Sequence, residues 1–213
     1  MARKYDRVTL VQHPLVEHKL ALLRDKDTPP SQFRQIVREV AMLEGYEASR
    51  NLPTKTVTVE TPLMATECQV LDMNPVIVPI LRAGLGLLDG ILDLVPSAVV
   101  GHLGMERDEE THAPREYYAK MPPQVGRRPV IIVDPMLATG GSAVAAIEYM
   151  RKQGVRNITL MVLVAAPEGI EAVLAADERV HIVTCAIDDG LNENAYILPG
   201  LGDAGDRIFG TLA

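Results

Sequence analysis

The sequence has few cysteines, no long apolar segment and no run of basic residues. Its 213 residues include only two cysteines, Cys68 and Cys185, which lie far apart and form no C-x-x-C pair. This argues against a disulfide framework or a cysteine zinc site, so buried free thiols are expected. No segment reaches the length of a membrane span, and the first four residues open no apolar leader, so we expect a cytoplasmic protein.

Positive charge is scarce as well. Lysine and arginine total 21 against 28 acidic residues, which gives a formal net charge of −7. Nucleic-acid backbones bind to basic patches, so neither nucleic acid nor membrane is an expected partner. His13 and His18 are five residues apart and would not share a helix face as a metal-binding pair does. An anionic substrate would therefore be held by a few well-placed cations and by backbone dipoles.

The hydrophobic content of 47% is enough for one sizeable core, and we expect a single domain over residues 1–213. Residues up to about 72 read as N-terminal helices followed by a β arm. The arm is predicted over residues 54–71, where β-branched residues alternate with polar ones as in a half-exposed antiparallel hairpin. Such an arm could pack on a partner subunit. The core sheet is expected over about 73–190, and a C-terminal loop over about 191–213.

Short apolar runs separated mostly by helical patterns predict the core. Five such runs read as buried strands, and they end at Leu81, Leu103, Asp134, Ala165 and Ala186. This alternation predicts an α/β fold with a doubly wound, mostly parallel five-stranded sheet flanked by helices. Ligands of such sheets bind at the carboxyl ends of the strands.

The stretch from Val130 to Ser142 carries the strongest functional signal. A strand of four apolar residues ends on Asp134, and a turn containing Gly140 and Gly141 leads directly into a helix. Glycines let the backbone bend tightly so that free N–H groups at the helix start can hold a phosphate. The lysine of a P-loop is missing. A capped turn without a ligand is the alternative, but Asp134 favours a ligand that also carries ribose hydroxyls.

The chain has two other glycine-rich stretches, one after the first buried strand and one in the tail. Arg82 follows the first buried strand beside Gly84 and Gly86, where an arginine is a good clamp for an anion. The tail contains a G-x-G-x-x-G pattern over residues 200–205, but too little chain follows it for a dinucleotide-binding unit. The charged residues 104–112 read as a solvated loop.

The motif Asp-Pro-Met-Leu-Ala-Thr-Gly-Gly-Ser resembles the phosphoribosyl pyrophosphate (PRPP) binding motif of type I phosphoribosyltransferases, in the form seen in the uracil phosphoribosyltransferase family. The resemblance implies the type I phosphoribosyltransferase fold. Most members have two acidic residues where this chain has Asp134 and Pro135, and the uracil subgroup shares this departure. The implied PRPP-binding residues are Asp134, Pro135, Met136, Leu137, Ala138, Thr139, Gly140, Gly141 and Ser142.

The resemblance also implies two arginines on the pyrophosphate of PRPP. One is Arg82, and the other is Arg107, which aligns with an arginine carried on a flexible flap. The family usually has an aromatic residue before that arginine, whereas this chain has Glu106. Arg82, Arg107 and Asp134 are thus the expected catalytic residues.

The tail from Tyr196 to Gly210 resembles the uracil-recognition loop of the same family, a hood over the base. Backbone groups of Ile197, Gly202 and Ala204 would hold uracil, and Asp203 would reach the PRPP side through a metal or water. Backbone donors and acceptors suit the alternating carbonyl and N–H edge of uracil and would leave the amino group of cytosine badly paired.

The implied reaction is pyrimidine salvage, in which uracil and PRPP give UMP and pyrophosphate. Mg²⁺ is the expected cofactor, bound through PRPP with no direct protein ligand, because it retains waters and needs few protein groups. Catalysis would rest on positioning N1 and neutralising the leaving group, and no residue is nominated as a general base. The family also suggests a homodimer or larger assembly and, in some members, a GTP effector.

Two alternatives remain. A pyrimidine-responsive RNA-binding regulator shares the fold and the reaction, although the acidic charge and the tail count against it. A purine or orotate phosphoribosyltransferase would carry an acidic pair where Asp134 and Pro135 stand.

Overall fold

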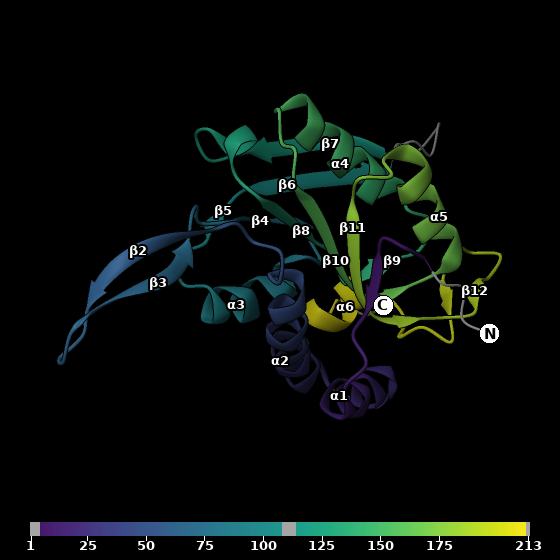
Figure 1. Cartoon of the computed structure of the whole chain (residues 1–213). Helices are drawn as coiled ribbons and strands as arrows, with labels where there is room; N and C mark the ends of the chain where they lie inside the picture. Colours follow the sequence, from purple (N-terminus) through teal and green to yellow (C-terminus); the bar gives the residue numbers. More distant parts are fainter. Residues whose placement is uncertain (1–4, 108–113, 212–213) are drawn as a thin grey trace.

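A computed structural model of the chain describes residues 5–107 and 114–211, with only the backbone at residues 106, 107 and 114 (Figure 1). Its central sheet has the strand order β1-β11-β10-β8-β4-β6-β7, with β5 beside β4 and β9 beside β10. All pairs are parallel except β6 with β7. The strands of this sheet are β1 (Val8–Leu10), β4 (Val76–Leu81), β5 (Val99–Val100), β6 (His102–Arg107), β7 (Pro114–Lys120), β8 (Val130–Val133), β9 (Met136–Leu137), β10 (Ile158–Ala165) and β11 (His181–Ile187).

The predicted doubly wound, mostly parallel sheet is confirmed, but it is wider than the five strands expected. The strand predicted over 98–103 breaks at Gly101 into β5 and β6. The edge strands β1 and β7 were not predicted. β1 has only three residues, too few to establish a period, and β7 is largely exposed and polar, so it lacks a hydrophobic pattern.

Helices cover both faces of the sheet (Figure 1), because the strands carry apolar side chains on both faces that are buried from water. One core cluster joins one face to α1, α2, α3 and α6, and a second joins the other face to α4 and α5. No helix in the described part of the chain is long and apolar enough to cross a membrane. The helices are α1 (Pro14–Arg24), α2 (Pro30–Ala48), α3 (Leu85–Leu94), η1 (Val125–Arg127), α4 (Gly141–Lys152), α5 (Pro167–Ala176) and α6 (Ala204–Phe209).

The predicted arm is an antiparallel hairpin of β2 (Thr54–Glu60) and β3 (Ala65–Leu71). It projects away from the sheet and the helices (Figure 1). At its tip the side chains of Leu63 and Met64 are 95% and 69% exposed. An isolated two-stranded hairpin is marginally stable in water, and this one exposes two large apolar side chains at its tip.

The winding of the chain reverses between β4 and β8. From β4 the chain crosses through α3 on one face, and from β8 it crosses through α4 on the other. A sheet of this kind opens a crevice at the carboxyl ends of the two strands where the winding reverses. Arg82 follows β4 and Asp134 follows β8, so both lie at this edge.

Candidate functional site

The predicted phosphate cradle is the turn over residues 138–142 that leads directly into α4. Gly140 has a φ of 85° and directly precedes α4, whose first-turn N–H groups have no acceptor within the helix. A Cβ at Gly140 would stand 2.9 Å from the Ala172 Cβ and 3.0 Å from the Gly169 carbonyl oxygen. Glycine is therefore required by both conformation and space. Thr139 and Ser142 are exposed in this turn, and the Thr139 hydroxyl oxygen accepts the Gly141 N–H at 3.5 Å.

The residues between Asp134 and the cradle have a structural task. Pro135 and Leu137 are buried, and the amides of Leu163 and Val164 donate to the Pro135 carbonyl at 3.1 and 3.2 Å. Met136 and Leu137 form β9, which pairs with the end of β10. Their side chains therefore fix the cradle to the sheet, and any contact of Pro135 or Leu137 with PRPP would come from the backbone.

Asp134 lies directly after β8, with its side chain partly buried. Its backbone N–H donates to the Met161 carbonyl at 3.2 Å, which holds the residue at the strand end. Burial raises the pKa of the Asp134 carboxyl to about 7, against a smaller opposing effect of the Met136 backbone. A carboxyl of this kind gains from the donors that the ribose hydroxyls of PRPP would supply.

Arg82 projects into solvent at the same edge. Its side chain is 61% exposed, and its guanidinium lies 3.6 Å from the Asp206 carboxylate. The guanidinium carbon also lies 5.9 Å from the centre of the Phe209 ring. Both partners belong to α6, so the predicted pyrophosphate arginine touches the segment that carries the predicted uracil loop.

Arg107 ends β6, the neighbour of β4, and its backbone pairs with Pro114 of β7. The backbone therefore reaches the edge at which Arg82 and Asp134 lie. The side chains of Glu106 and Arg107 lie outside the described residues, as does the flap segment 108–113. The contact of Arg107 with pyrophosphate stays a prediction.

The C-terminal loop begins with a small antiparallel pair, β12 (Gly190–Leu191) and β13 (Ile197–Leu198). Ile197 is buried opposite Leu191, while the Tyr196 and Leu198 carbonyls on either side accept hydrogen bonds from the neighbouring segment. Since antiparallel pairs alternate in this way, the backbone N–H and C=O of Ile197 point away from β12. The Ile197 carbonyl faces Gly200, and the contact of Ile197 with uracil stays a prediction.

The next residues turn the loop into α6. Gly202 is exposed with a φ of 76°, and Asp203 is the N-cap residue, accepting the Asp206 N–H at 2.9 Å. Ala204, the first residue of α6, is buried. The close approach of Gly86 to Ile208, where a Cβ would stand 2.7 Å from Cδ1, packs α6 against the first turn of α3, which begins three residues after Arg82. The predicted base loop and PRPP residues thus meet at one edge.

Sequence reasoning missed three residues that hold this loop. Arg24 and Asp188 form an ion pair at 2.7 Å that binds the backbone of Gly200, and Arg207 binds the Leu201 carbonyl at 2.8 Å. Each is an ordinary charged residue in its own segment. Two signals could have suggested the Arg24–Asp188 pair: an arginine side chain is long enough to reach another segment, and Asp188 comes directly after the β11 strand.

The described residues contain no group of three His, Cys, Asp or Glu side chains that could hold a metal ion. At the site, the Asp203 carboxylate has one oxygen, Oδ1, occupied by the α6 cap. The other oxygen, Oδ2, could reach a Mg²⁺ ion on PRPP through water, and this role of Asp203 stays a prediction.

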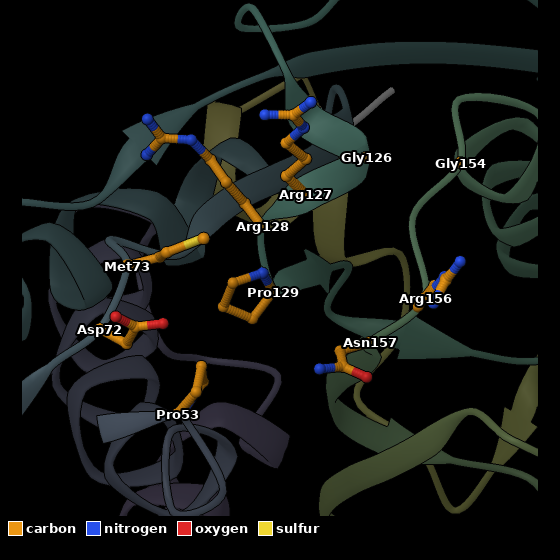
Figure 2. Close-up of a pocket in the computed structure, with 10 residues that line it drawn as sticks. All are labelled: Pro53, Asp72, Met73, Gly126, Arg127, Arg128, Pro129, Gly154, Arg156 and Asn157. Atoms are coloured by element: carbon orange, nitrogen blue, oxygen red, sulfur yellow. The ribbon is translucent and has the colours of Figure 1, made fainter. Parts of the chain in front are cut away.

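A separate cavity of about 510 Å³ lies at the opposite, amino-terminal edge of the sheet. Figure 2 shows Arg127 and Arg128 along one side of it and Arg156 and Asn157 along another. The cavity lies at the amino-terminal ends of β8 and β10, whereas Asp134 and the cradle follow the carboxyl-terminal end of β8. No predicted site residue lines it, so this cavity is not the candidate site.

Solved structures share the fold. The chain superposes on the AQ2163 protein from Aquifex aeolicus with a TM-score of 0.89 and 36% identity, covering 95% of this chain and 97% of that chain. It superposes on adenine phosphoribosyltransferase from Trypanosoma brucei with a TM-score of 0.58 and 10% identity, over 90% and 88% of the two chains. At 10% identity the second likeness concerns the fold alone.

The fold and the cradle define a type I phosphoribosyltransferase. A uracil phosphoribosyltransferase of Symbiobacterium thermophilum is 53% identical over 206 residues, which is 96% of this chain and 99% of that protein. The family model described as uracil phosphoribosyltransferase matches residues 10–211. The chain belongs to the uracil phosphoribosyltransferase family. Neither comparison supports the RNA-binding alternative or a purine or orotate enzyme.

Proposed function

We propose that the protein transfers the phosphoribosyl group of PRPP to N1 of uracil and releases UMP and pyrophosphate. The observation that carries this function is the meeting of the cradle, Arg82 and the C-terminal loop at one edge of the sheet, in a chain of this family. The proposal includes pyrimidine salvage as the physiological role. The cytoplasmic location stays a prediction.

Each part of the site has a distinct task in this reaction. The amides that open α4, with the hydroxyls of Thr139 and Ser142, hold the 5′-phosphate, and Asp134 accepts hydrogen bonds from the ribose hydroxyls. Arg82 draws negative charge away from the anomeric carbon as pyrophosphate departs. The backbone of the C-terminal loop holds uracil with N1 facing that carbon. Catalysis then rests on positioning and charge neutralisation.

Mg²⁺ is proposed to arrive with PRPP, where it would neutralise the pyrophosphate oxygens. Asp203 would help to hold this Mg²⁺ ion only indirectly. Its exposed carboxylate lies in the predicted base loop and would reach the ion through water. Removal of divalent metal with EDTA is expected to abolish UMP formation without lowering the unfolding temperature of the protein. A lowered unfolding temperature would indicate a structural metal instead.

The role of Arg82 is tested by UMP formation in the Arg82→Ala variant. We expect a loss of about 10² in kcat/KM for PRPP, because a charged donor to the leaving group is removed. The matched control is Arg38→Ala, which removes another exposed arginine paired with an aspartate, Asp93, at 2.6 Å on the helical face. Equal activity of the two variants would contradict the assignment of Arg82.

The arm supports a homodimer or larger assembly. Leu63 and Met64 stand at the exposed tip of a hairpin that projects from the molecule (Figure 1), and burying them on a second copy would remove apolar surface from water. We expect Leu63→Lys combined with Met64→Lys to lower the mass measured by light scattering. An unchanged mass would show that the arm is not part of the interface.

We also propose that GTP activates the enzyme. The test is to measure the rate of UMP formation at limiting PRPP with and without added GTP.

A further inference from the structure

We infer that Arg24 and Asp188 are positioning residues that set where uracil binds, because their ion pair holds the backbone of the C-terminal loop at Gly200. This inference rests on the proposed function. Neither residue lies in the PRPP motif or in the predicted base-binding set. Their role would be to fix the backbone groups that recognise the base.

The pair and the loop form a closed set of hydrogen bonds. Arg24 donates from Nη2 to Asp188 Oδ1 at 2.7 Å and from Nη1 to Asp188 Oδ2 at 2.8 Å. The same Nη1 donates to the Gly200 carbonyl at 2.7 Å, while the Gly200 N–H donates to Asp188 Oδ2 at 2.8 Å. Both polar groups of Gly200 are therefore held by one ion pair.

The two charged residues come from rigid elements. Arg24 is the last residue of α1, and Asp188 follows β11, where its N–H donates to the Ala165 carbonyl at 2.9 Å. The side chains are 26% and 6% exposed, so the pair is shielded from water more than a surface salt bridge. Shielded, bidentate hydrogen bonds between charged groups are the stronger kind. The loop is thus fastened to the sheet and to a helix at once.

Gly200 itself adds to the constraint. It is buried with a φ of 59°, and a Cβ there would stand 2.2 Å from the Ile197 carbonyl oxygen. The turn brings Ile197 back toward the residues that follow Gly200, so a shift at Gly200 moves both ends of the predicted base-binding set. Ile197 precedes it by three residues, and Gly202 follows it by two.

Arg207 holds the next residue of the loop, Leu201, as Arg24 holds Gly200. It donates to the carbonyls of Leu201 and Leu23, and a second guanidinium nitrogen donates to the Asp25 carbonyl. Its guanidinium carbon lies 4.3 Å from the centre of the Phe33 ring. The carbonyls of Gly200 and Leu201 are therefore both tied to the end of α1 by arginines. A loop tied in this way presents its free backbone groups in one geometry, which base selection requires.

The test uses Arg24→Lys and Asp188→Asn, each compared with the unaltered protein for steady-state kinetics with uracil and for inhibition of uracil turnover by cytosine. An ammonium group cannot form the fork that spans both Asp188 oxygens and the Gly200 carbonyl. We expect KM for uracil to rise about 10- to 100-fold, the scale of a lost charged hydrogen bond. We expect KM for PRPP to change less than about twofold. The ratio of the inhibition constant of cytosine to KM for uracil should fall about 10- to 100-fold, because the loop backbone no longer discriminates between the two bases.

The matched control is the pair of Arg151 with Asp177, which has side chains 17% and 8% exposed and an N–O distance of 2.5 Å. Arg151 also donates to two backbone carbonyls, those of Val155 and Arg156, but at the opposite end of α4 from the cradle. Arg151→Lys and Asp177→Asn should lower the unfolding temperature and leave both KM values unchanged. The comparison separates positioning from stability.

A rise of both KM values together in the Arg24 and Asp188 variants, or no change in either, would overturn the inference while leaving the proposed function intact. Failure of the unaltered protein to form UMP would instead refute the proposed function. If Asp188→Asn does not fold, Arg24→Lys decides, because it retains the positive charge and most of the side-chain volume.

Discussion

Arg82 and Asp206 lie 3.6 Å apart, nitrogen to oxygen, and so connect the end of β4 to α6. Asp206 also accepts a hydrogen bond from the Thr211 hydroxyl at 2.6 Å, on the same oxygen, Oδ1. The arginine predicted to hold pyrophosphate therefore faces a carboxylate of the neighbouring helix α6. Pyrophosphate and Asp206 would compete for the same guanidinium.

The first prediction concerns this competition. Asp206→Asn should lower KM for PRPP by about two- to fivefold, since an exposed pair is worth up to ~1 kcal/mol and that attraction would no longer hold Arg82. Initial-rate measurements with varied PRPP would check it. Asp93→Asn, which frees Arg38 in the same way on the helical face, should leave KM for PRPP unchanged. An increase in KM for Asp206→Asn would show that the carboxylate aids PRPP binding.

The second prediction concerns the cradle. Gly140→Ala should destabilise the protein by about 1–3 kcal/mol and weaken PRPP binding, because alanine is strained at this φ and its Cβ would crowd Ala172 and Gly169. Gly154→Ala is the control. Gly154 has nearly the same φ, 83°, but the nearest atom to an added Cβ lies 3.9 Å away.

Thermal unfolding and a PRPP titration distinguish the two glycine variants. Both should lose stability through backbone strain, whereas only Gly140→Ala should lose affinity for PRPP. Equal affinity in the two variants would show that the turn at Gly140 is structural and does not shape the phosphate site.

The third prediction concerns pH. Burial raises the pKa of Asp134 to about 7 in the free protein, so the carboxyl gives up its proton as pH rises through neutrality. The ribose hydroxyls donate to the charged form, and PRPP binding should therefore strengthen between pH 6 and pH 8. Isothermal titration with PRPP across this range would measure the change. Asp134→Asn should bind more weakly at high pH and keep only the pH dependence that comes from the ligand's own phosphates.

The fourth prediction concerns Glu44, whose carboxyl is fully buried on α2 beside the Cys185 thiol and the Val162 backbone. Burial raises its pKa well above 4.5, so the folded protein keeps this proton after the unfolded chain has lost it. Stability should therefore fall as pH rises above 4.5, by up to ~1.4 kcal/mol per pH unit.

Glu44→Gln should remove that slope, since an amide does not ionise. Urea unfolding at pH 5 and pH 8 would compare the two proteins, and the glutamine variant should lose less stability between the two pH values. Parallel curves would mean that Glu44 is charged in the folded protein. The nearby Cys185 thiol, whose own pKa burial raises, is not expected to titrate in this range.

The sheet and the cradle could be predicted because their signals are local. Val130–Val133, Asp134 and the glycines occupy consecutive positions, and strand order then follows from alternation with helices. The edge strand Val8–Leu10 could not be predicted, since three residues carry no period. The burial of Glu44 could not be predicted either, because it comes from the packing of α2 on the sheet.

The residues that hold the C-terminal loop could not be predicted for a different reason. Arg24 and Asp188 are 164 positions apart, and each is unremarkable within its own segment. Their pairing depends on where the end of α1 lies relative to β11, which no short pattern encodes. The division of the chain into helices and arm, core sheet and C-terminal loop stays a prediction.

The most direct measurement is the product formed from PRPP and Mg²⁺ with uracil, orotate, cytosine or hypoxanthine as the base. Our account predicts UMP and pyrophosphate from uracil and no nucleotide from the other three. Turnover of another base in preference to uracil would contradict our assignment of the loop from Ile197 to Ala204, and no turnover of uracil would contradict the proposed function itself.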